Sequence, residues 1–437
     1  MVAKKIQAKL TPEEKLQQAL VPEAEQSYKI PANWCWTRLG NVTNIIMGQS
    51  PNGGSITENE KDTPLIGGAA DMGEKYPEIK RYTNKPTKIS SDEDLIICVR
   101  ATLGKPIFSD GRYCLGRGVA AIRPLVGSRK LYKYFFLNFE QYLFDNATGT
   151  TFAQVNSNIL QKMPLALPPL AEQQRIVERI ESLFAKLDEA KENMQNVLDG
   201  FETRKAAILH KAFTGELTAN WRKQHDVSID SWEEKKLGKI VKNIKDKYEP
   251  TLNNKKCVKY IGLEHIEKNN GIIGFGSSDD VKSLKTIFEL GDILYGKLRP
   301  YLNKHDIAKF SGICSTDILV YRAEDFNTAK FINYFMNTEK FIFYTVSNSK
   351  GINLPRISEK EVSGILVNVP TLSEQSEIVR IIDDLLAKEQ QAKELAENAI
   401  TKIDIIKKSI LARAFRGELG TNNPADESAV ELLKRVL

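Results

Sequence analysis

Apolar side chains recur in alternating steps of four and three residues along two stretches of the chain, 176–201 and 378–403. This spacing predicts two helices, each with the apolar seam of a coiled coil. The predicted seam consists of Ile176, Ile180, Leu183, Leu187, Met194, Val197 and Phe201 in the first helix and of Ile378, Ile382, Leu385, Ala392, Ala396, Ala399 and Ile403 in the second. The small residues of the second seam would let another helix approach closely.

The two helices belong to a repeated segment. The sequence PPLAEQQRIVERI, beginning at Pro168, returns as PTLSEQSEIVRII, beginning at Pro370, and both copies end in AF-x-GEL, at 212–217 and 414–419. An internal repeat fixes the architecture of a chain before any local motif does. The chain is therefore expected to hold two copies of one plan, in which a mixed segment precedes a long helix.

Both helices carry start and stop signals. Thr371, followed three residues later by Glu374, predicts a capping box at the second start. Gly215 and Gly417, each just beyond a phenylalanine, are expected to end the helices. One helix over 171–212 would be roughly 63 Å long at 1.5 Å per residue. Two such helices are expected to form an antiparallel coiled coil, with the mixed segments at opposite ends about a pseudo-twofold axis.

Short apolar runs, separated by glycines and polar turns, fill the two mixed segments. Runs of this length that are rich in Ile, Val and Tyr predict strands. They lie at 64–68, 94–100 and 118–124 in the first segment, and at 259–266, 291–302 and 317–322 in the second. An aromatic stretch of helical character follows in each segment, at 130–144 and 329–346. The predicted fold class is α+β, with two domains of like fold.

Charge changes this picture, because it is uneven around a net value of +6. Residues 31–150 carry 15 Lys and Arg against 12 Asp and Glu, and residues 231–360 carry 22 against 16. The repeat helices are acidic, with 7 against 9 over 168–220 and 10 against 12 over 369–437. The basic excess therefore lies on the mixed segments. It favours a polyanionic partner, although a basic surface that only faces solvent has the same composition.

Several kinds of chemistry are excluded. The segment GDILYGK at 291–297 matches the start of a P-loop, but Leu298 stands where Ser or Thr would bind magnesium. The four histidines have no ligand spacing, so no metal site is expected. The five cysteines are scattered and never spaced as CxxC, which favours a reducing cytoplasm, and no apolar run is long enough for a membrane span. No catalytic, cofactor-binding or metal-binding residue is predicted.

The chain resembles the DNA-specificity subunits of type I restriction–modification systems over nearly its whole length. The most specific features are the paired P-x-L-x-EQ-x-x-I-V helix starts, at Pro168–Val177 and Pro370–Val379, and the paired AF-x-GEL ends. The resemblance implies a target recognition domain in each mixed segment, with the helices separating the two. The expected parts are an N-terminal helical extension (1–30), recognition domain 1 (31–167), helix 1 (168–220), recognition domain 2 (221–369), helix 2 (370–419) and a C-terminal tail (420–437).

The resemblance also implies partners and cofactors. Such a chain binds double-stranded DNA and assembles with two modification subunits, which methylate DNA, and two restriction subunits, which cleave it. S-adenosylmethionine would belong to the modification subunits, and ATP with magnesium to the restriction subunits. No cofactor and no catalytic activity are expected in this chain.

Residues that could contact DNA are those whose side chains can pair with base edges or phosphates. Because recognition domains diverge widely, the resemblance assigns no contact residue by residue. The candidates in domain 1 are Gln49, Ser50, Lys75, Arg81, Arg100, Lys105, Arg112, Arg117, Thr150 and Thr151. The candidates in domain 2 are Lys245, Lys247, Tyr248, Lys297, Arg299, Asn303, Lys304, Ser349 and Lys350.

Three alternatives stay open. The chain could serve a related restriction–modification system with a different nuclease partner. It could be a scaffold without DNA, in which a coiled coil joins two protein-binding modules, although the basic bias of the domains argues against this. An enzyme fused to its own DNA reader is disfavoured by the absence of catalytic motifs.

Overall fold

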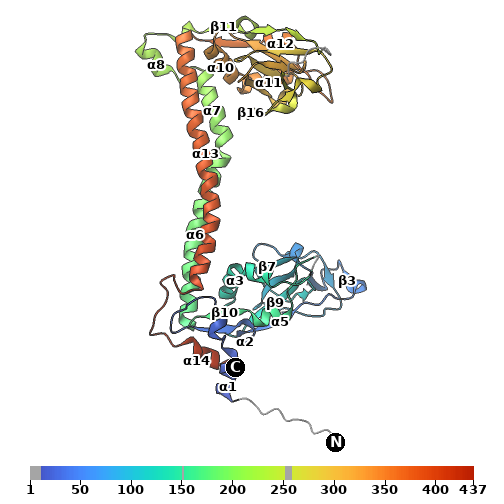
Figure 1. Cartoon of the computed structure of the whole chain (residues 1–437), viewed down its shortest axis with the longest axis vertical. Coiled ribbons are helices and arrows are strands. Elements are labelled where there is room, and N and C mark those ends of the chain that lie inside the picture. Colours follow the sequence, from blue (N-terminus) through green and yellow to red (C-terminus); the bar gives the residue numbers. More distant parts are fainter. Residues whose placement is uncertain (1–10, 150–151, 251–257) are drawn as a thin grey trace. The chain divides into compact units, whose positions relative to one another are not determined.

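The computed structural model describes residues 11–149, 152–250 and 258–437. The chain divides into two compact units, of which unit 1 holds residues 1–193 and 399–437, and unit 2 holds residues 194–398 (Figure 1). Each unit combines one mixed domain with parts of both long helices, so the unit boundaries cut through the helices. No helix among the described residues has the length and apolar character needed to cross a membrane.

Unit 1 is built around a four-stranded antiparallel sheet with the order β2-β9-β6-β7. Leu95 and Ile97 of the central strand β6 face the core that contains helix α3, whereas Ile96 and Cys98 face a second core on the other side. This alternation follows from the pleat of a strand that is buried on both faces. The strands are β1 (Cys35–Arg38), β2 (Thr43–Met47), β3 (Ile56–Thr57), β4 (Thr63–Ile66), β5 (Tyr82–Thr83), β6 (Leu95–Arg100), β7 (Thr102–Phe108), β8 (Cys114–Leu115), β9 (Val119–Pro124) and β10 (Pro164–Leu167). The helices are α1 (Pro12–Ala19), α2 (Leu39–Val42), α3 (Arg129–Asn138), α4 (Glu140–Asp145), α5 (Ser157–Lys162), the start of α6 (Leu170–Asp199), the end of α13 (Leu372–Ala414) and α14 (Ala429–Lys434).

Unit 2 repeats this arrangement in the sheet β12-β22-β19-β20. Ile293 and Tyr295 of β19 face the core beside helix α10, and Leu294 faces the opposite core. The strands are β11 (Glu233–Lys236), β12 (Lys242–Ile244), β13 (Lys247–Tyr248), β14 (Lys259–Ile261), β15 (Ile266–Glu267), β16 (Gly271–Ile272), β17 (Gly276–Ser277), β18 (Lys285–Phe288), β19 (Ile293–Gly296), β20 (His305–Ile307), β21 (Gly312–Cys314), β22 (Ile318–Arg322) and β23 (Leu366–Val369). The helices, besides α13, are α7 (Phe201–Phe213), α8 (Ala219–Gln224), α9 (Leu237–Ile240), α10 (Phe326–Phe335), α11 (Glu339–Ser347) and α12 (Glu359–Ser363).

The same buried ion pair braces both sheets. Arg123 on β9 donates two hydrogen bonds to Asp94, at 2.7 and 2.9 Å, and Arg322 on β22 donates two to Asp292, at 2.7 and 2.8 Å. Both aspartates are almost fully buried, and each also caps the backbone of the turn before it. The predicted α+β class with two domains of like fold is confirmed.

The long helices pack side by side and antiparallel within each unit. In unit 1, Lys191 pairs with Asp404 at 3.1 Å, and Asp188, three residues earlier, pairs with Lys407, three residues later. In unit 2, Arg204 Nε lies 2.7 Å from Glu389 Oε2. All predicted seam positions are buried or half-buried.

One prediction about the first helix was wrong, because α6 and α7 are separated at Gly200 rather than forming one helix. Arg204 folds back there and donates a hydrogen bond to the carbonyl of Val197 at 2.8 Å, while it also holds Glu389. A Cβ at position 200 would lie 2.3 Å from the Arg204 guanidinium. The second copy has Lys402 at the matching position, and α13 runs through 43 residues without a break.

The glycine stops are confirmed, but the capping box is not. Gly215 and Gly417 follow the helix ends with φ of +83° and +74°, a conformation that favours glycine. The Thr371 hydroxyl accepts the amide of Glu374 at 3.4 Å, which is half of a capping box. The Glu374 side chain does not return to Thr371, because it is buried and bonds Thr218, Arg222 and Trp232 instead.

Both ends of the described chain pack into unit 1. Helix α1 contacts α14, whose Leu432 and Leu433 are buried in the core of domain 1. Asn33 donates a hydrogen bond to the carbonyl of Asn423 at 3.0 Å, and its own carbonyl accepts the amide of Ala429 at 2.9 Å. The C-terminal tail therefore completes the first domain, which the sequence did not indicate.

Candidate nucleic-acid interface

One edge of each four-stranded sheet gathers four loops. In domain 1 the end of β2, the start of β9 and the end of β6 meet there, because β9 runs antiparallel to both neighbours. The loop before α5 joins them through the bond from the amide of Ala101 to the carbonyl of Ala153, at 2.8 Å. We call this surface the loop edge. It comprises residues 48–50, 99–101, 116–118 and 153–155 in domain 1, and residues 245–248, 297–299, 315–317 and 354–356 in domain 2.

The loop edge of domain 1 presents polar and basic side chains that are held in place. Arg117 donates from its Nε to the hydroxyl of Ser50 at 3.2 Å, and its amide bonds the same oxygen at 3.3 Å. Arg100 donates from Nη2 to the amide oxygen of Gln154 at 3.1 Å. Gln49, Ser50, Arg100 and Arg117 are exposed. Two guanidiniums and two amide or hydroxyl groups thus face solvent with no carboxylate among the residues of this edge.

The loop edge of domain 2 is more basic. The amide of Lys297 donates to the carbonyl of Asp317 at 2.8 Å, and its carbonyl accepts the amide of Ile357 at 3.1 Å. Arg356 forms an ion pair with Asp317 and lies close to Lys297. Burial and then the positive charge of Arg356 lower the pKa of Lys297, with Lys247 adding to the effect. Burial and the neighbouring cations thus outweigh the attraction between Asp317 and Lys297 at this edge.

The turn beside the loop edge is strained at equivalent positions in both domains. Ala101 and Lys105 have φ of +62° and +45° in domain 1, and Arg299 and Asn303 have φ of +50° and +42° in domain 2. Residues other than glycine rarely adopt this conformation, and they cluster at functional sites. The repeated strain is consistent with a surface whose shape matters to function.

Some sequence candidates lie on the loop edge or on the turn and loop that adjoin it. They are Gln49, Ser50, Arg100 and Arg117 in domain 1, and Lys245, Lys247, Tyr248, Lys297, Arg299, Ser349 and Lys350 in domain 2. Arg81 lies near this edge, with Nη2 at 3.5 Å from Asp71. Lys105 and Lys304 bond backbone carbonyls, of Met72 and Leu263. Thr150 and Thr151 lie outside the described residues.

Three candidates do not lie on the loop edge. The carbonyl of Lys75 accepts the amide of Phe108, at the far end of β7, so Lys75 lies at the opposite edge of the sheet. Arg112 lies on the 110–113 turn beside the start of β6, also at the opposite edge. Asn303 is only 6% exposed, and its amide nitrogen bonds the Met336 carbonyl at 2.9 Å. Lys75 and Arg112 therefore lie away from the loop edge, and Asn303 is buried.

Gln154 and Arg356 were missed by the sequence interpretation. They lie in the polar loops that follow the candidates Thr151 and Lys350, and they form matching bridges, to Arg100 and to Leu298. The signal that could have found them is the repeat itself, since the two residues are 202 positions apart, like the helix starts.

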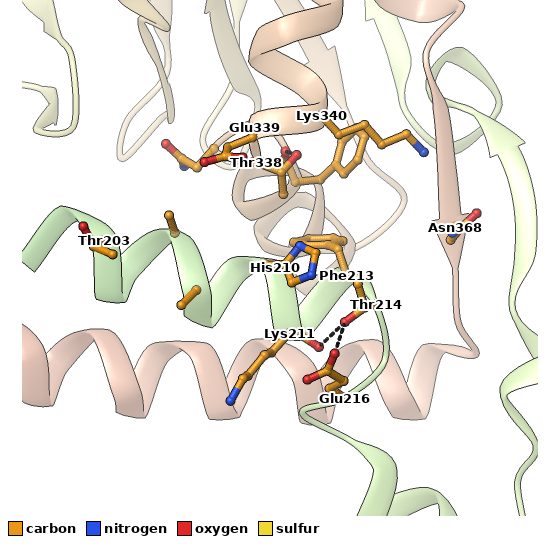
Figure 2. Close-up of a pocket in the computed structure, with 14 residues that line it drawn as sticks. Thr203, His210, Lys211, Phe213, Thr214, Glu216, Thr338, Glu339, Lys340 and Asn368 are labelled. Carbon is orange, nitrogen blue, oxygen red and sulfur yellow. Dashed lines mark hydrogen bonds between the residues drawn. The ribbon is translucent and has the colours of Figure 1, made fainter.

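A separate hollow lies between α7 and the start of α11 in unit 2, with a volume of about 600 Å³. Figure 2 shows His210 and Phe213 of α7 facing Thr338, Glu339 and Lys340 across it, with Thr214 just beyond the end of α7. The lining is largely apolar, and in it the Thr214 hydroxyl donates to the Glu216 carboxylate at 3.5 Å. Among the described residues, no group of three or more His, Cys, Asp or Glu could hold a metal ion.

Comparison with known proteins agrees with this geometry. Residues 31–198 and 229–400 each match the model of the family described as the type I restriction modification DNA specificity domain. The chain is 26% identical over 445 residues to the type I restriction enzyme EcoDI specificity subunit of Escherichia coli, covering 93% of this chain and 95% of that protein. It is 25% identical over 455 residues to the StySPI specificity subunit of Salmonella potsdam, with coverage of 93% and 96%.

A solved structure shares the fold. The crystal structure of the HsdS subunit from Thermoanaerobacter tengcongensis superposes with a TM-score of 0.65 at 18% identity, covering 90% of this chain and all of that one. The two copies of the family domain match the two mixed domains, and each match extends into the long helix that follows its domain.

Proposed function

The chain belongs to the family of type I restriction–modification DNA specificity proteins, and from this premise we propose how it chooses its site. It is the non-catalytic DNA-recognition subunit of such a system. Each domain applies its loop edge to one half of a bipartite DNA sequence. The paired helices set the length of the unspecified gap between the two halves.

The observation that carries this proposal is the duplication of the loop edge with different side chains. The same four loops come together in both domains, but Ser50 and Arg117 of domain 1 are matched by Tyr248 and Thr316 in domain 2. Side chains of different hydrogen-bonding character select different base edges. The two half-sites are therefore expected to differ, which makes the complete site asymmetric.

The chemistry of methylation and cleavage would belong to partner subunits. We expect two modification subunits, with S-adenosylmethionine, and two restriction subunits, with ATP and magnesium. Cofactor binding by the partners remains a prediction.

The outer faces of the long helices are the surfaces best suited to the modification subunits. In unit 2 the hollow beside α7 is apolar, and Leu395 of α13 is 62% exposed. In unit 1 the α13 residues Ile405 and Ile406 are 62% and 44% exposed. Apolar side chains along an exposed helix face are typical of a surface that another helix covers.

Salt dependence of binding tests the proposal against a scaffold without DNA. The probe is a pool of random duplexes of about 40 base pairs, long enough for two half-sites one or two helical turns apart. The complex of this chain with its modification subunit should select a bipartite sequence, and its affinity should fall steeply as salt rises. A complex that forms normally but selects no sequence would favour the scaffold instead.

A further inference from the structure

The loops that precede α5 and α12 have the same construction. Thr148 pairs with Gln154 in one, and Lys350 pairs with Arg356 in the other. Gly149 and Gly351 follow the first partner with φ of +103° and +106°. A Cβ there would lie 2.5 Å from the Phe152 carbonyl oxygen and 3.0 Å from the Leu354 carbonyl oxygen. Each loop is thus closed at its base by one bridge, beside a glycine in a conformation that other residues rarely adopt, and we call the two loops hairpins.

Large apolar side chains stand exposed at matching positions of the two hairpins. Phe152 is 65% exposed, and Leu354, its counterpart 202 positions later, is 56% exposed. Ile352 at the tip of the second hairpin is 99% exposed. The last turn of the preceding helix repeats the pattern, since Phe144 is 41% and Val346 is 40% exposed.

Isolated exposed apolar residues are common on protein surfaces, so one of these alone would mean little. Two features set this group apart. The exposure recurs at equivalent places in two domains whose neighbouring side chains differ. In addition, Lys350 and Arg356 flank the second tip, and Arg100 is bonded to the base of the first through Gln154. An apolar tip between cations suits a ligand with an anionic backbone and apolar faces inside, which is the character of duplex DNA.

We propose that the two hairpins enter a groove of the DNA and press Phe152, and Ile352 with Leu354, against a base-pair step as apolar wedges. Proteins that bind in the minor groove use Phe, Leu and Ile in this way, partly unstacking a step and bending the duplex. The flanking basic residues then hold the phosphates on either side. This inference rests on the proposed function and adds the contact residues and the deformation to it.

The wedge is tested in domain 2 with the double variant Ile352→Ser and Leu354→Ser. The matched control is Leu290→Ser, because Leu290 is 68% exposed in the same domain but lies before β19, at the opposite edge of the sheet. The probe is the duplex that the wild-type complex selects from the random pool, with 2-aminopurine placed in turn at each position of both half-sites. Fluorescence of this base rises when it is unstacked.

The expected result is a rise in fluorescence at one step of one half-site with the wild type and the control. The double variant should lose that rise and bind about tenfold or more weakly, since it no longer buries two apolar side chains. The single variant Phe152→Ser should do the same at the other half-site. Because all three side chains are exposed, these changes should leave the fold intact.

Other results would overturn the inference. Wild-type affinity and an unchanged fluorescence rise in the double variant would show that the hairpin makes no wedge. Normal DNA binding with loss of the modification subunit would show that the tips contact protein. If the wild-type complex itself selects no sequence, the proposed function fails, which the first two results would not imply.

Discussion

The indole Nε1 of Trp34 donates a 2.7 Å hydrogen bond to the Oε2 atom of Glu172, a carboxylate with no exposed surface. Thr421 and Asn422 donate to the same carboxylate at 3.1 and 2.8 Å. In unit 2, Glu374 accepts bonds from Trp232 and Thr218 in the same manner. Each buried glutamate joins the start of a domain, the start of one long helix and the segment that follows the end of the other.

Glu172→Ala should destabilise unit 1 by about 3 kcal/mol, because the buried Trp34 indole and two half-buried donors lose their acceptor at once. The sensitive observable is hydrogen exchange of amides in residues 31–193 and 399–437, which reports the local free energy of opening. Glu189→Ala, at an exposed position of the same helix, is the control and should change little. Equal effects of the two substitutions would show that Glu172 has no special structural role.

His305 should make the stability of unit 2 depend on pH. Burial lowers its pKa below the ordinary 6.5, against the effects of Asn333 and Asp306. The folded unit then binds fewer protons than the unfolded one. The stability that the neutral His305 ring contributes is fully present above pH 6.5. This contribution is lost as the pH falls below that value, by at most about 1.4 kcal/mol per pH unit.

Of the two side chains bonded to the ring of His305, Asn303 opposes protonation in addition to burial, because its amide nitrogen is a donor and faces Nε2. Nδ1 lies 2.8 Å from Asn333 Oδ1, and Nε2 lies 3.2 Å from the amide nitrogen of Asn303, which suits a neutral ring. His305→Gln should remove the loss of stability between pH 7 and pH 5, measured by hydrogen exchange in unit 2. His225→Gln, at an exposed position, should keep it. An identical pH slope in wild type and His305→Gln would contradict the assignment.

Substitutions at the two loop edges should act on different half-sites. Arg117→Ala is expected to relax the sequence preference in one half and Lys297→Ala in the other, each by about 1–3 kcal/mol per lost base contact. Sequence selection from the random duplex pool measures both preferences at once. Lys75→Ala, at the opposite edge of domain 1, should leave both unchanged. A variant that weakens both halves equally would indicate a phosphate contact rather than base recognition.

Lengthening the paired helices should lengthen the unspecified gap. Residues 187–193 and 402–408 face each other through the Lys191–Asp404 and Asp188–Lys407 pairs, so a heptad duplicated in both keeps the seam in register. Each helix gains about 10 Å, close to three base pairs of DNA. The selected gap should grow by about that amount while both half-sites stay the same. Altered half-sites with an unchanged gap would show that the helices do not set the spacing.

The repeat made the architecture predictable, because the 202-residue offset and the seam periodicity are properties of the chain itself. It could not show the interruption at Gly200, which depends on Arg204 reaching Val197 and Glu389. Nor could it show that Glu374 is committed to Thr218 and Arg222, since those contacts join segments more than 150 positions apart. The spacing of Thr371 and Glu374 predicted a capping box, but contacts with distant segments engage the Glu374 side chain instead.

The sequence indicated which types of residue could contact DNA, but it did not indicate where those residues lie in the fold. Arg100 and Arg117 come together only because strands β6 and β9 pair antiparallel. Lys75 and Asn303 looked equally suitable in the sequence. In the fold, Lys75 lies at the opposite edge, where its carbonyl accepts the amide of Phe108. Asn303 is buried, and its amide nitrogen donates to the carbonyl of Met336.

The most direct test of the central claim is a base-resolution map of methylation in DNA modified by this chain together with its modification subunit. The account predicts one asymmetric motif, made of two short specified parts around a gap of fixed length. A continuous motif would contradict it, because at most one loop edge would then be in contact with the DNA.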